Sequence, residues 1–266
     1  MEIHRTTCPL DCPDLCALEV AVEGGRLVQI DGSREDSVTN GFICGKVRQF
    51  GEHVYCPERL LTPARRVGAK GEARFEPMSW DEALERIVAE IRRAQATLGG
   101  ESILPFSYGG SNGKLTHDAL DARFFRRVGA SQLARTVCAA PTGRVALEMY
   151  GKMHGVAYED YAEAQLIVIW GANPHASNIH LVPFLKAARQ KGAKLVVVDP
   201  RATPLARQAD LHLAVRPGTD VAVALSVIRW LFASNRCDSK KDIATGARTL
   251  RRITLRTKRV LDLPWP

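Results

Sequence analysis

Four cysteines near the N-terminus have the spacing of a metal-binding site. Cys8, Cys12 and Cys16 recur every fourth residue, and Cys44 follows further along the chain. Thiolates held this close together repel one another and oxidise unless a soft cation binds them. Four sulfur ligands suit either a tetrahedral zinc ion or a [4Fe–4S] cluster. The residues therefore predict a thiolate-rich metal centre and leave the choice between zinc and iron open.

Three loops in the second half of the chain carry residues suited to binding a nucleotide, at 171–174, 199–201 and 216–220. Each follows an apolar run typical of a buried strand, and ligands of open α/β sheets bind just outside the carboxyl ends of the strands. Arg201 and Arg216 can donate to phosphate oxygens, and Asp199 or Asp220 can accept from a ribose hydroxyl or a base edge. The alternative is that glycine and proline only end these strands and that aspartate only caps helices.

The elements that would position these residues alternate along the chain. Apolar runs predict strands at 102–107, 165–170, 194–198 and 211–215, and helical periodicity predicts helices at 117–128, 179–191 and 220–233. A capping box at Ser79 and Glu82 predicts another helix that ends near Gly99. Continuous apolar strands between helices indicate a parallel sheet covered on both faces. The fold class expected is α/β, with a doubly wound, mainly parallel domain.

The cysteines are expected in a smaller β-rich cap that precedes this domain. Residues 17–23 and 26–31 alternate apolar and polar side chains on either side of Gly24 and Gly25. Two glycines between alternating runs predict a two-residue β-hairpin, and the following residues lead back towards Cys44. The cap would occupy roughly the first 60 residues.

The composition is that of a globular protein that keeps its thiols reduced. The chain has 266 residues, of which 45% are hydrophobic, enough for a real core. Its seven cysteines are odd in number and clustered towards one end, which argues against a secreted disulfide framework. No leader-like segment precedes the cysteines, and no apolar run approaches the roughly 18 residues of a membrane span. We expect a cytoplasmic protein without a membrane span.

The net charge of +8 does not predict nucleic-acid binding. Residues 239–266 hold eight basic and two acidic residues, so most of the excess lies in a tail. No aromatic-interleaved or groove-reading motif accompanies these charges. A solvated basic tail is the favoured interpretation.

Seven segments, in order, resemble the N-terminal half of the prokaryotic molybdopterin oxidoreductases. That family includes formate dehydrogenases, periplasmic-type nitrate reductases and dimethyl sulfoxide reductases. The segments are CPLDCPDLC at 8–16, GFICGK at 41–46, RLLTP at 59–63, SWDEA at 79–83, WGANP at 170–174, VDPR at 198–201 and RPGTD at 216–220.

The resemblance implies two cofactors and a set of residues that bind them. The four cysteines would hold a [4Fe–4S] cluster, and Lys46 would relay electrons between the cluster and a pterin. Cys138 falls where the family supplies a ligand to molybdenum, on a short turn with Gly143, although a lone cysteine is more often a small buried apolar residue. The second cofactor would be molybdenum, or tungsten, bis(molybdopterin guanine dinucleotide). Its expected contacts are Lys46, Gly110, Trp170, Gly171, Asn173, Asp199, Arg201, Pro217, Gly218 and Asp220.

The activity implied is an oxidoreductase reaction on a small-molecule substrate that the sequence does not identify. Electrons would pass between the substrate at molybdenum and the cluster, and onward to a redox partner protein. The alternative is a non-catalytic iron–sulfur electron-transfer protein, a remnant without a complete active site.

Family catalytic subunits are much longer than this chain, and the resemblance ends near residue 236. We expect an iron–sulfur cap at 1–62, an incomplete cofactor-binding domain at 63–236 and a non-family basic tail at 237–266. A truncated gene product or fragment would account for this. The missing C-terminal family portion, if encoded separately, would then be a partner.

Overall fold

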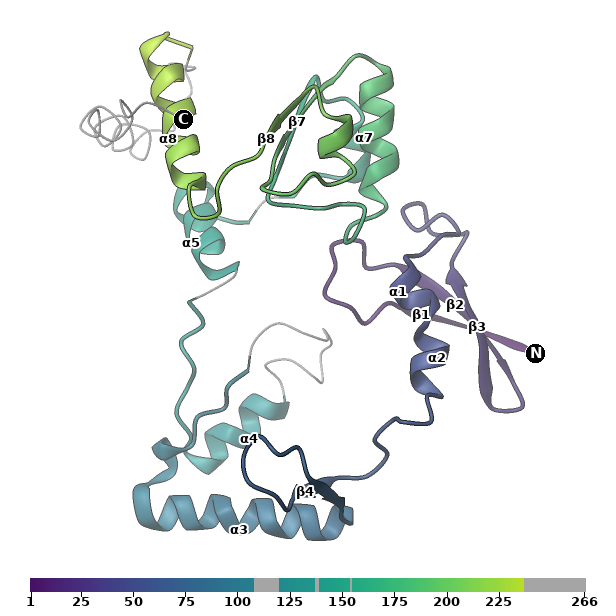
Figure 1. The fold of residues 1–266 in the computed structure, drawn as a ribbon, viewed down its shortest axis with the longest axis vertical. Coiled ribbons are helices and arrows are strands. Elements are labelled where there is room, and N and C mark those ends of the chain that lie inside the picture. The colour runs from purple at the N-terminus through teal and green to yellow at the C-terminus, as the bar shows by residue number, and fades with distance from the viewer. Residues whose placement is uncertain (108–119, 137–138, 154, 237–266) are drawn as a thin grey trace. The chain divides into compact units, whose positions relative to one another are not determined.

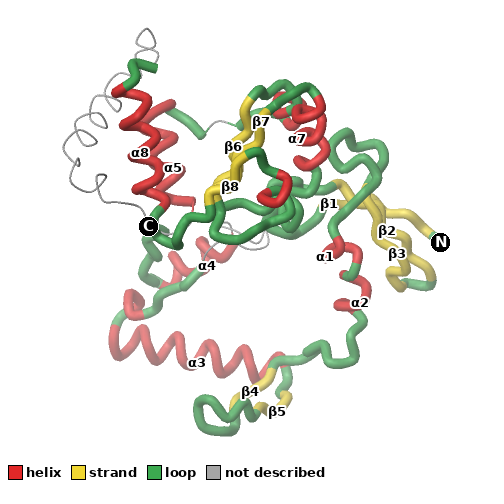
Figure 2. Tube along the Cα trace, turned by 45° about the horizontal axis from the view of Figure 1, so that its top comes forward, coloured by secondary structure: helices red, strands yellow, loops and turns green. Residues whose placement is uncertain are grey.

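The structure is a computed structural model that describes residues 1–107, 120–136, 139–153 and 155–236 (Figure 1). Contacts divide the chain into two compact units, Met1–Arg135 and Thr136–Pro266. The protein is of the mixed α/β class, with an antiparallel sheet near its N-terminus and a parallel sheet in its second unit (Figure 2). No helix among the described residues is long and apolar enough to cross a membrane.

The first unit begins with a three-stranded antiparallel sheet of order β1-β2-β3. Its strands are β1 (Glu2–Thr7), β2 (Ala17–Glu23) and β3 (Arg26–Gly32). The predicted hairpin is confirmed: Glu23 pairs with Arg26, and Gly24 and Gly25 have φ angles of +55° and +74°. Positive φ at both central residues is the mark of a type I′ turn, whose twist matches that of the strands. β1 was not predicted, because it lies at the sheet edge with every residue exposed and therefore has no apolar alternation.

A small core beneath this sheet holds the cysteine segment in place. It contains Leu18, Ile30, Ile43 and Val47 together with buried cysteines. Two short helices, α1 (Gly45–Arg48) and α2 (Phe50–Val54), follow the loop that returns from β3. The buried Thr39 fixes that loop, since its hydroxyl accepts a hydrogen bond from the Ala17 backbone N–H at 3.0 Å.

The remainder of the first unit is built around one long helix. A hairpin of β4 (Ala64–Arg66) and β5 (Phe75–Pro77) leads into α3 (Trp80–Leu98), and η1 (Gly100–Ser102) and α4 (Leu120–Val128) follow. The predicted capping box is present, with Ser79 and Glu82 bonded reciprocally. The end of the helix before Gly99 is confirmed as well.

The strand predicted at 102–107 is wrong. Residues 103–107 form no strand. Ile103 makes two isolated backbone hydrogen bonds, from its N–H to the Gly100 carbonyl oxygen at 3.0 Å and from the Ser131 N–H to its carbonyl oxygen at 2.9 Å. A strand needs a neighbour for its ladder, and an apolar run alone does not provide one.

The second unit contains a parallel sheet of order β6-β7-β8. Its strands are β6 (Leu166–Trp170), β7 (Lys194–Val198) and β8 (Leu211–Leu213), and its helices are α5 (Ala139–Tyr150), α6 (Tyr158–Tyr161), α7 (Leu181–Gln190) and α8 (Asp220–Ala233), with η2 (Ala206–Gln208) before β8. The predicted strands and helices are confirmed here. β8 is shorter than predicted because the Val215 N–H bonds to the Leu213 carbonyl oxygen and turns the chain away.

Helix α7 covers one face of the parallel sheet. Ile167 and Ile169 of β6 pack with Leu185 of α7 and with Leu195 and Val197 of β7 in the core. The alternate residues of β6 point the other way, and Leu166, Val168 and Trp170 are 60%, 49% and 38% exposed. Helices on both faces were expected, but the outward face of β6 is bare in the described part of the chain.

Candidate functional site

The four cysteines lie on two segments that the cap brings together. Cys8, Cys12 and Cys16 occupy the connection between β1 and β2, and Cys44 directly precedes α1. The Cys8 N–H bonds to the Cys16 carbonyl oxygen at 2.9 Å, which closes the connection into a loop. Leu15 makes the turn possible by adopting a φ of +44°. None of the four cysteines forms a disulfide, and Cys44 packs against the hydrophobic cluster that contains Cys8 and Cys16.

Burial makes negative charge costly at two of these thiols. Burial raises the pKa of Cys8, and the Cys44 and Cys12 sulfurs add to this. Burial likewise raises the pKa of Cys16 to about 12, with contributions from Asp14, Cys8 and Cys12. As thiolates these groups would destabilise one another, and a bound cation would offset that repulsion, so the donor set fits a thiolate-ligated metal cluster.

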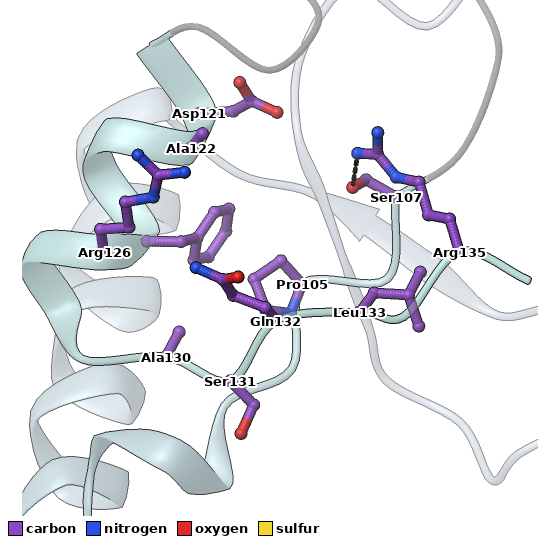
Figure 3. Close-up of a pocket in the computed structure, with 11 residues that line it drawn as sticks. Pro105, Ser107, Asp121, Ala122, Arg126, Ala130, Ser131, Gln132, Leu133 and Arg135 are labelled. Atoms are coloured by element: carbon purple, nitrogen blue, oxygen red, sulfur yellow. Dashed lines mark hydrogen bonds between the residues drawn. The ribbon is translucent and has the colours of Figure 1, made fainter. Parts of the chain in front are cut away.

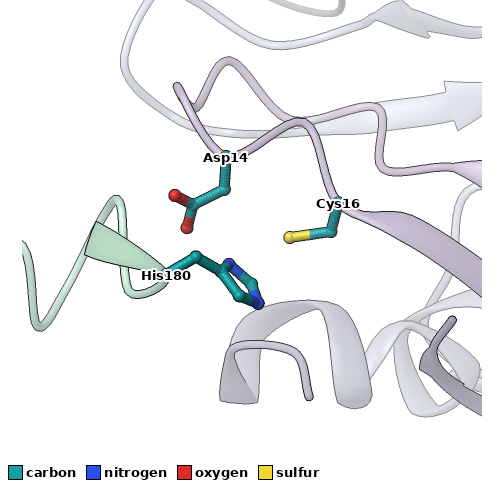
Figure 4. Close-up of side chains that lie close together, drawn as sticks. All are labelled: Asp14, Cys16 and His180. Carbon is teal, nitrogen blue, oxygen red and sulfur yellow. The ribbon is translucent and has the colours of Figure 1, made fainter. Parts of the chain in front are cut away.

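Asp14 and Cys16 lie on the same connection between β1 and β2 (Figure 4). His180, also drawn there, belongs to the second unit and directly precedes α7. Lys46 lies in α1, two residues after Cys44, and its positive charge acts to lower the pKa of Cys8. The sequence-predicted cation is therefore within electrostatic range of the predicted metal ligands.

The predicted nucleotide loops lie along one edge of the parallel sheet. Trp170 pairs with Val198, and Val198 pairs with Leu213, so the three strands end in register. Two backbone hydrogen bonds extend this edge: the Gly171 N–H donates to the Val198 carbonyl oxygen at 2.9 Å, and the Asp199 N–H donates to the Leu213 carbonyl oxygen at 3.2 Å. The carboxyl ends of the strands thus bring the first two loops together.

Asn173 has a buried acceptor without a donor. Its side-chain oxygen Oδ1 is shielded from solvent and has no hydrogen-bond partner. A buried, unpaired amide oxygen costs about 1 to 3 kcal/mol. Its position after β6, at the edge where α/β sheets bind ligands, fits an acceptor that a bound molecule satisfies.

The third loop is tied to the first by a side-chain contact across fifty residues. The indole Nε1–H of Trp170 donates to Asp220 Oδ1 at 2.7 Å. The Thr219 N–H bonds to the Arg216 carbonyl oxygen at 3.1 Å, and Gly218 has a φ of +87°. This is the geometry of a type II turn with Pro217 at its second position. The turn brings the start of α8 beside the end of β6.

Asp199 and Arg201 form a compact turn at the end of β7. The Arg201 N–H donates to Asp199 Oδ1 at 2.7 Å, and His212 Nε2 lies 2.8 Å from the Asp199 carbonyl oxygen. The Arg201 side chain is exposed, while Asp199 is buried. One carboxylate oxygen of Asp199 thus shapes the loop, and the Arg201 guanidinium faces solvent, where it can reach an anion.

Two predicted site residues, Gly110 and Cys138, lie outside the described residues. The turn expected around Gly143 is wrong, because Gly143 lies inside α5. Alanine, arginine, leucine, glutamate and methionine favour helix over this stretch, and Arg144 pairs with Glu148 one turn later at 2.6 Å. The low helix propensity of one glycine does not outweigh these contributions.

A polar cavity in the first unit was not predicted (Figure 3). It has a volume of about 290 Å³ and lies between α4 and the two extended segments that contain Ser107 and Arg135. An Arg135 Nη2–H donates to Ser107 Oγ at 3.1 Å. The sequence carried no signal for this cavity, since its lining comes from separate segments.

Comparison with known proteins identifies the family. A family model described as molybdopterin oxidoreductase matches residues 59–258, and a model described as molybdopterin oxidoreductase Fe4S4 domain matches residues 1–56. The chain belongs to the molybdopterin oxidoreductase family. Its Fe4S4 match contains all four cysteines of the cap, so family membership implies a [4Fe–4S] cluster and a molybdopterin cofactor.

Similar proteins include several bacterial oxidoreductases. The chain is 41% identical over 236 residues to the probable oxidoreductase YoaE of Bacillus subtilis, covering 89% of this chain and 35% of that protein. It is 29% identical to the dimethyl sulfoxide reductase DmsA of Escherichia coli, covering 88% of this chain and 31% of DmsA. The chain thus spans about a third of the length of these relatives.

A solved structure shows the same fold. Acetylene hydratase from Pelobacter acetylenicus superposes with a TM-score of 0.73 at 26% identity, covering 95% of this chain and 35% of that one. The likeness supports the α/β architecture of this molybdopterin oxidoreductase chain.

Proposed function

We propose that the chain provides the iron–sulfur cap and one dinucleotide-binding edge of a molybdenum bis(molybdopterin guanine dinucleotide) oxidoreductase. The proposal rests on four cysteines that lie on two neighbouring segments of the cap without forming a disulfide, two of them buried and with the charge of Lys46 acting on Cys8. When bound, the molybdenum centre supplies two-electron chemistry on a small-molecule substrate, and the cluster supplies one-electron transfer to a redox partner protein.

The cap residues have separate roles in this proposal. Cys8, Cys12, Cys16 and Cys44 hold the cluster as thiolates. Lys46 places a positive charge near them, which favours the extra electron on reduction and can donate a hydrogen bond to a pterin. Cys138 supplies a ligand to molybdenum. Thiols stay reduced in the cytoplasm, where a cluster can be assembled on them, so we propose a cytoplasmic location.

The sheet edge would hold one guanine dinucleotide arm. Asn173 offers its unpaired oxygen to a donor on the ligand, and Arg201 offers its guanidinium to phosphate. The turn at Pro217 and Gly218 leaves backbone close to the ligand, and Trp170 fixes Asp220 beside it. The proposed contacts of this dinucleotide arm also include Gly110, Gly171 and Asp199.

Two apolar surfaces of this chain are exposed, and we propose that the part of the relatives that this chain lacks covers them. The outward face of β6 is exposed, and α8 is apolar on all sides yet has no buried residue. A helix of that composition belongs inside a larger domain. We propose that polypeptide corresponding to the missing two-thirds of the relatives covers both surfaces, on this chain or on another.

The same surfaces favour a second function for the chain when it is alone. If nothing covers the outward face of β6, the cofactor edge is open to solvent on that side. The cap can still bind a cluster by itself, because its core and its four cysteines lie within residues 1–56. The second candidate is therefore an iron–sulfur electron-transfer protein without a molybdenum site.

Metal analysis of anaerobically purified chain tests the cap. We expect about four iron and four sulfide per chain, with a broad visible absorption. Serine at Cys12 or Cys44 should remove most of the iron. Serine at Cys56, an exposed free cysteine within the same segment, is the matched control and should leave it unchanged. A colourless protein that binds zinc through the same cysteines would contradict the proposal.

Molybdenum and pterin content of the same samples separates the two functions. Molybdenum with pterin supports the oxidoreductase, and iron alone supports the electron-transfer protein. Co-expression with the downstream portion of a relative should raise molybdenum content if that portion closes the cofactor edge.

A further inference from the structure

A groove runs along α7 on the side that faces η2. It has a volume of about 490 Å³, within the range of ligand-binding sites, and lies entirely within the second unit. One wall is a single face of α7, whose residues at positions i, i+3, i+4 and i+7 are Val182, Leu185, Lys186 and Arg189. The opposite wall includes Leu205 and Gln208.

The floor of the groove is aliphatic and rigid. Leu185, Ala193 and Leu205 line it, and all three are buried in the core of the unit. Side chains held in a packed core keep their positions, so the floor offers a preformed apolar surface. Such a floor contributes affinity through burial of a partner's apolar side chains.

The rim of the groove has an excess of positive charge. Lys186, Arg189 and Lys194 line it, against one carboxylate, Asp210. Both oxygens of Asp210 are engaged: Oδ1 accepts from Lys194 Nζ at 3.1 Å, and Oδ2 accepts from the Leu195 N–H at 2.9 Å. These bonds lower the pKa of Asp210, and the positive charges of Lys194 and Arg189 lower it further.

The three cations of the groove face a single carboxylate, whose charge acts on both Lys194 and Arg189, so the groove keeps a net positive charge. Within the described part of the chain neither Lys186 nor Arg189 forms an ion pair, whereas Lys191 and Lys194 each do. Lys186 and Arg189 are three residues apart on α7 and therefore neighbours on its surface. Two adjacent cations above an apolar floor suit a partner that carries both acidic and apolar side chains.

We infer that this groove docks an extended acidic segment of another polypeptide. In an extended chain, successive side chains point to opposite sides, so alternating residues would place aliphatic groups on the floor and carboxylates against Lys186 and Arg189. Charge complementarity of this kind sets specificity and association rate. Lys194 and Asp210 place the charged part of the groove at the amino ends of β7 and β8, while His175, which follows the first proposed cofactor loop, also lines it.

Fluorescence anisotropy with a labelled octapeptide that alternates glutamate and leucine tests this inference. The full chain should bind it, more weakly at higher salt. The Lys186→Glu/Arg189→Glu double variant should bind at least about tenfold more weakly. Lys152→Glu is the matched control, because Lys152 is exposed in the same unit and does not line the groove; its affinity should equal that of the parent chain.

Further measurements distinguish a loss of binding at the groove from a loss of folding. Circular dichroism should show equal helix content for the parent chain and both variants, which establishes that both variants fold. Val182→Asp, which places a carboxylate in the groove, should weaken binding independently. Equal binding by the parent and the double variant would overturn the inference. Full displacement of the peptide by millimolar glutarate would also overturn it, by assigning the groove to a small dianion.

Discussion

At the scale of single residues, two asparagines of one loop differ in hydrogen bonding, because the side-chain oxygen of one is unpaired and that of the other accepts a bond. Asn173 and Asn178 lie in the same loop after β6. The Asn173 side-chain oxygen is buried without a donor, whereas the Asn178 side-chain oxygen accepts a hydrogen bond from the Tyr158 hydroxyl. The first asparagine is costly to the chain alone, and the second stabilises it.

Alanine at these two positions should separate ligand binding from stability. Asn173→Ala should leave the free energy of unfolding unchanged or raise it by up to about 1 to 3 kcal/mol, because it removes a buried oxygen that has no hydrogen-bond donor. It should weaken the binding of GDP, a probe for the dinucleotide arm, by roughly tenfold or more. Calorimetric titration with GDP and urea unfolding supply the two readouts.

Asn178→Ala is the matched control, for which we expect lower stability and unchanged ligand binding. It removes the bond to Tyr158 and places alanine at a φ of +83°, so we expect a loss of about 1 to 2 kcal/mol with GDP affinity unchanged. If the two variants behave alike, Asn173 is not a ligand-binding residue.

At the scale of elements, the loop between β3 and α1 positions Cys44 through close backbone packing. A Cβ at Gly32 would lie 2.8 Å from the Phe42 backbone nitrogen and 2.9 Å from its carbonyl oxygen. Neither atom can move without shifting the loop. Gly45 lies next to Cys44, yet a Cβ there would meet nothing within 4 Å.

Gly32→Ala should therefore lower the iron content of the cap although no ligand is changed. Gly45→Ala should retain it, despite being next to a ligand. Iron and sulfide analysis of both variants after anaerobic reconstitution provides the measurement. Full iron content in Gly32→Ala would show that the loop tolerates displacement.

The capping box of α3 makes that helix sensitive to acid. The Ser79 N–H and hydroxyl donate to Glu82 at 2.8 Å and 3.0 Å, and these bonds lower the pKa of Glu82 below its ordinary value of 4.5. Because the folded-state pKa is the lower one, the stabilisation is complete at neutral pH and is lost as the pH falls from about 4.5 through that folded-state value.

Ser79→Ala should cost about 1 kcal/mol at pH 7. The difference in unfolding free energy between the parent and Glu82→Gln should shrink as the pH falls through this range. Urea unfolding at pH 7, 5 and 3.5, followed by circular dichroism, measures both effects. A difference that is independent of pH would contradict the role given to the Glu82 carboxylate.

At the scale of the whole molecule, the second unit buries one face of its sheet and leaves the other face bare. Val168 and Ile169 are adjacent in β6, but Val168 is 49% exposed and Ile169 is 8% exposed. Parallel sheets are normally covered on both sides. The bare face is the structural reason for proposing that further polypeptide covers it.

Threonine at the two positions should report which face is packed. In this chain alone, Val168→Thr should change the free energy of unfolding by no more than about 0.5 kcal/mol. Ile169→Thr should cost about 2 to 3 kcal/mol, because it leaves a gap and buries a hydroxyl. Urea unfolding followed by tryptophan fluorescence gives both values. Equal costs would show that the outward face is already packed.

The amino-acid sequence alone predicted a thiolate-rich metal site, and it predicted most of the regular structure that the fold shows. The cysteine spacing, the glycine turn at Gly24 and Gly25, the capping box and the strands and helices of the second unit depend on residues close together along the chain. Local patterns report such features because the physical cause lies within a few residues. The family resemblance also followed from short motifs.

Features that depend on distant segments could be found only in the folded protein. These are the missing strand at 103–107, the bond between Trp170 and Asp220, the unpaired oxygen of Asn173 and the groove along α7. A strand requires a neighbour, and burial of an atom depends on what packs over it. The pairing of a strand and the burial of an atom cannot be read from the adjacent residues. Both depend on distant chain segments that folding brings together.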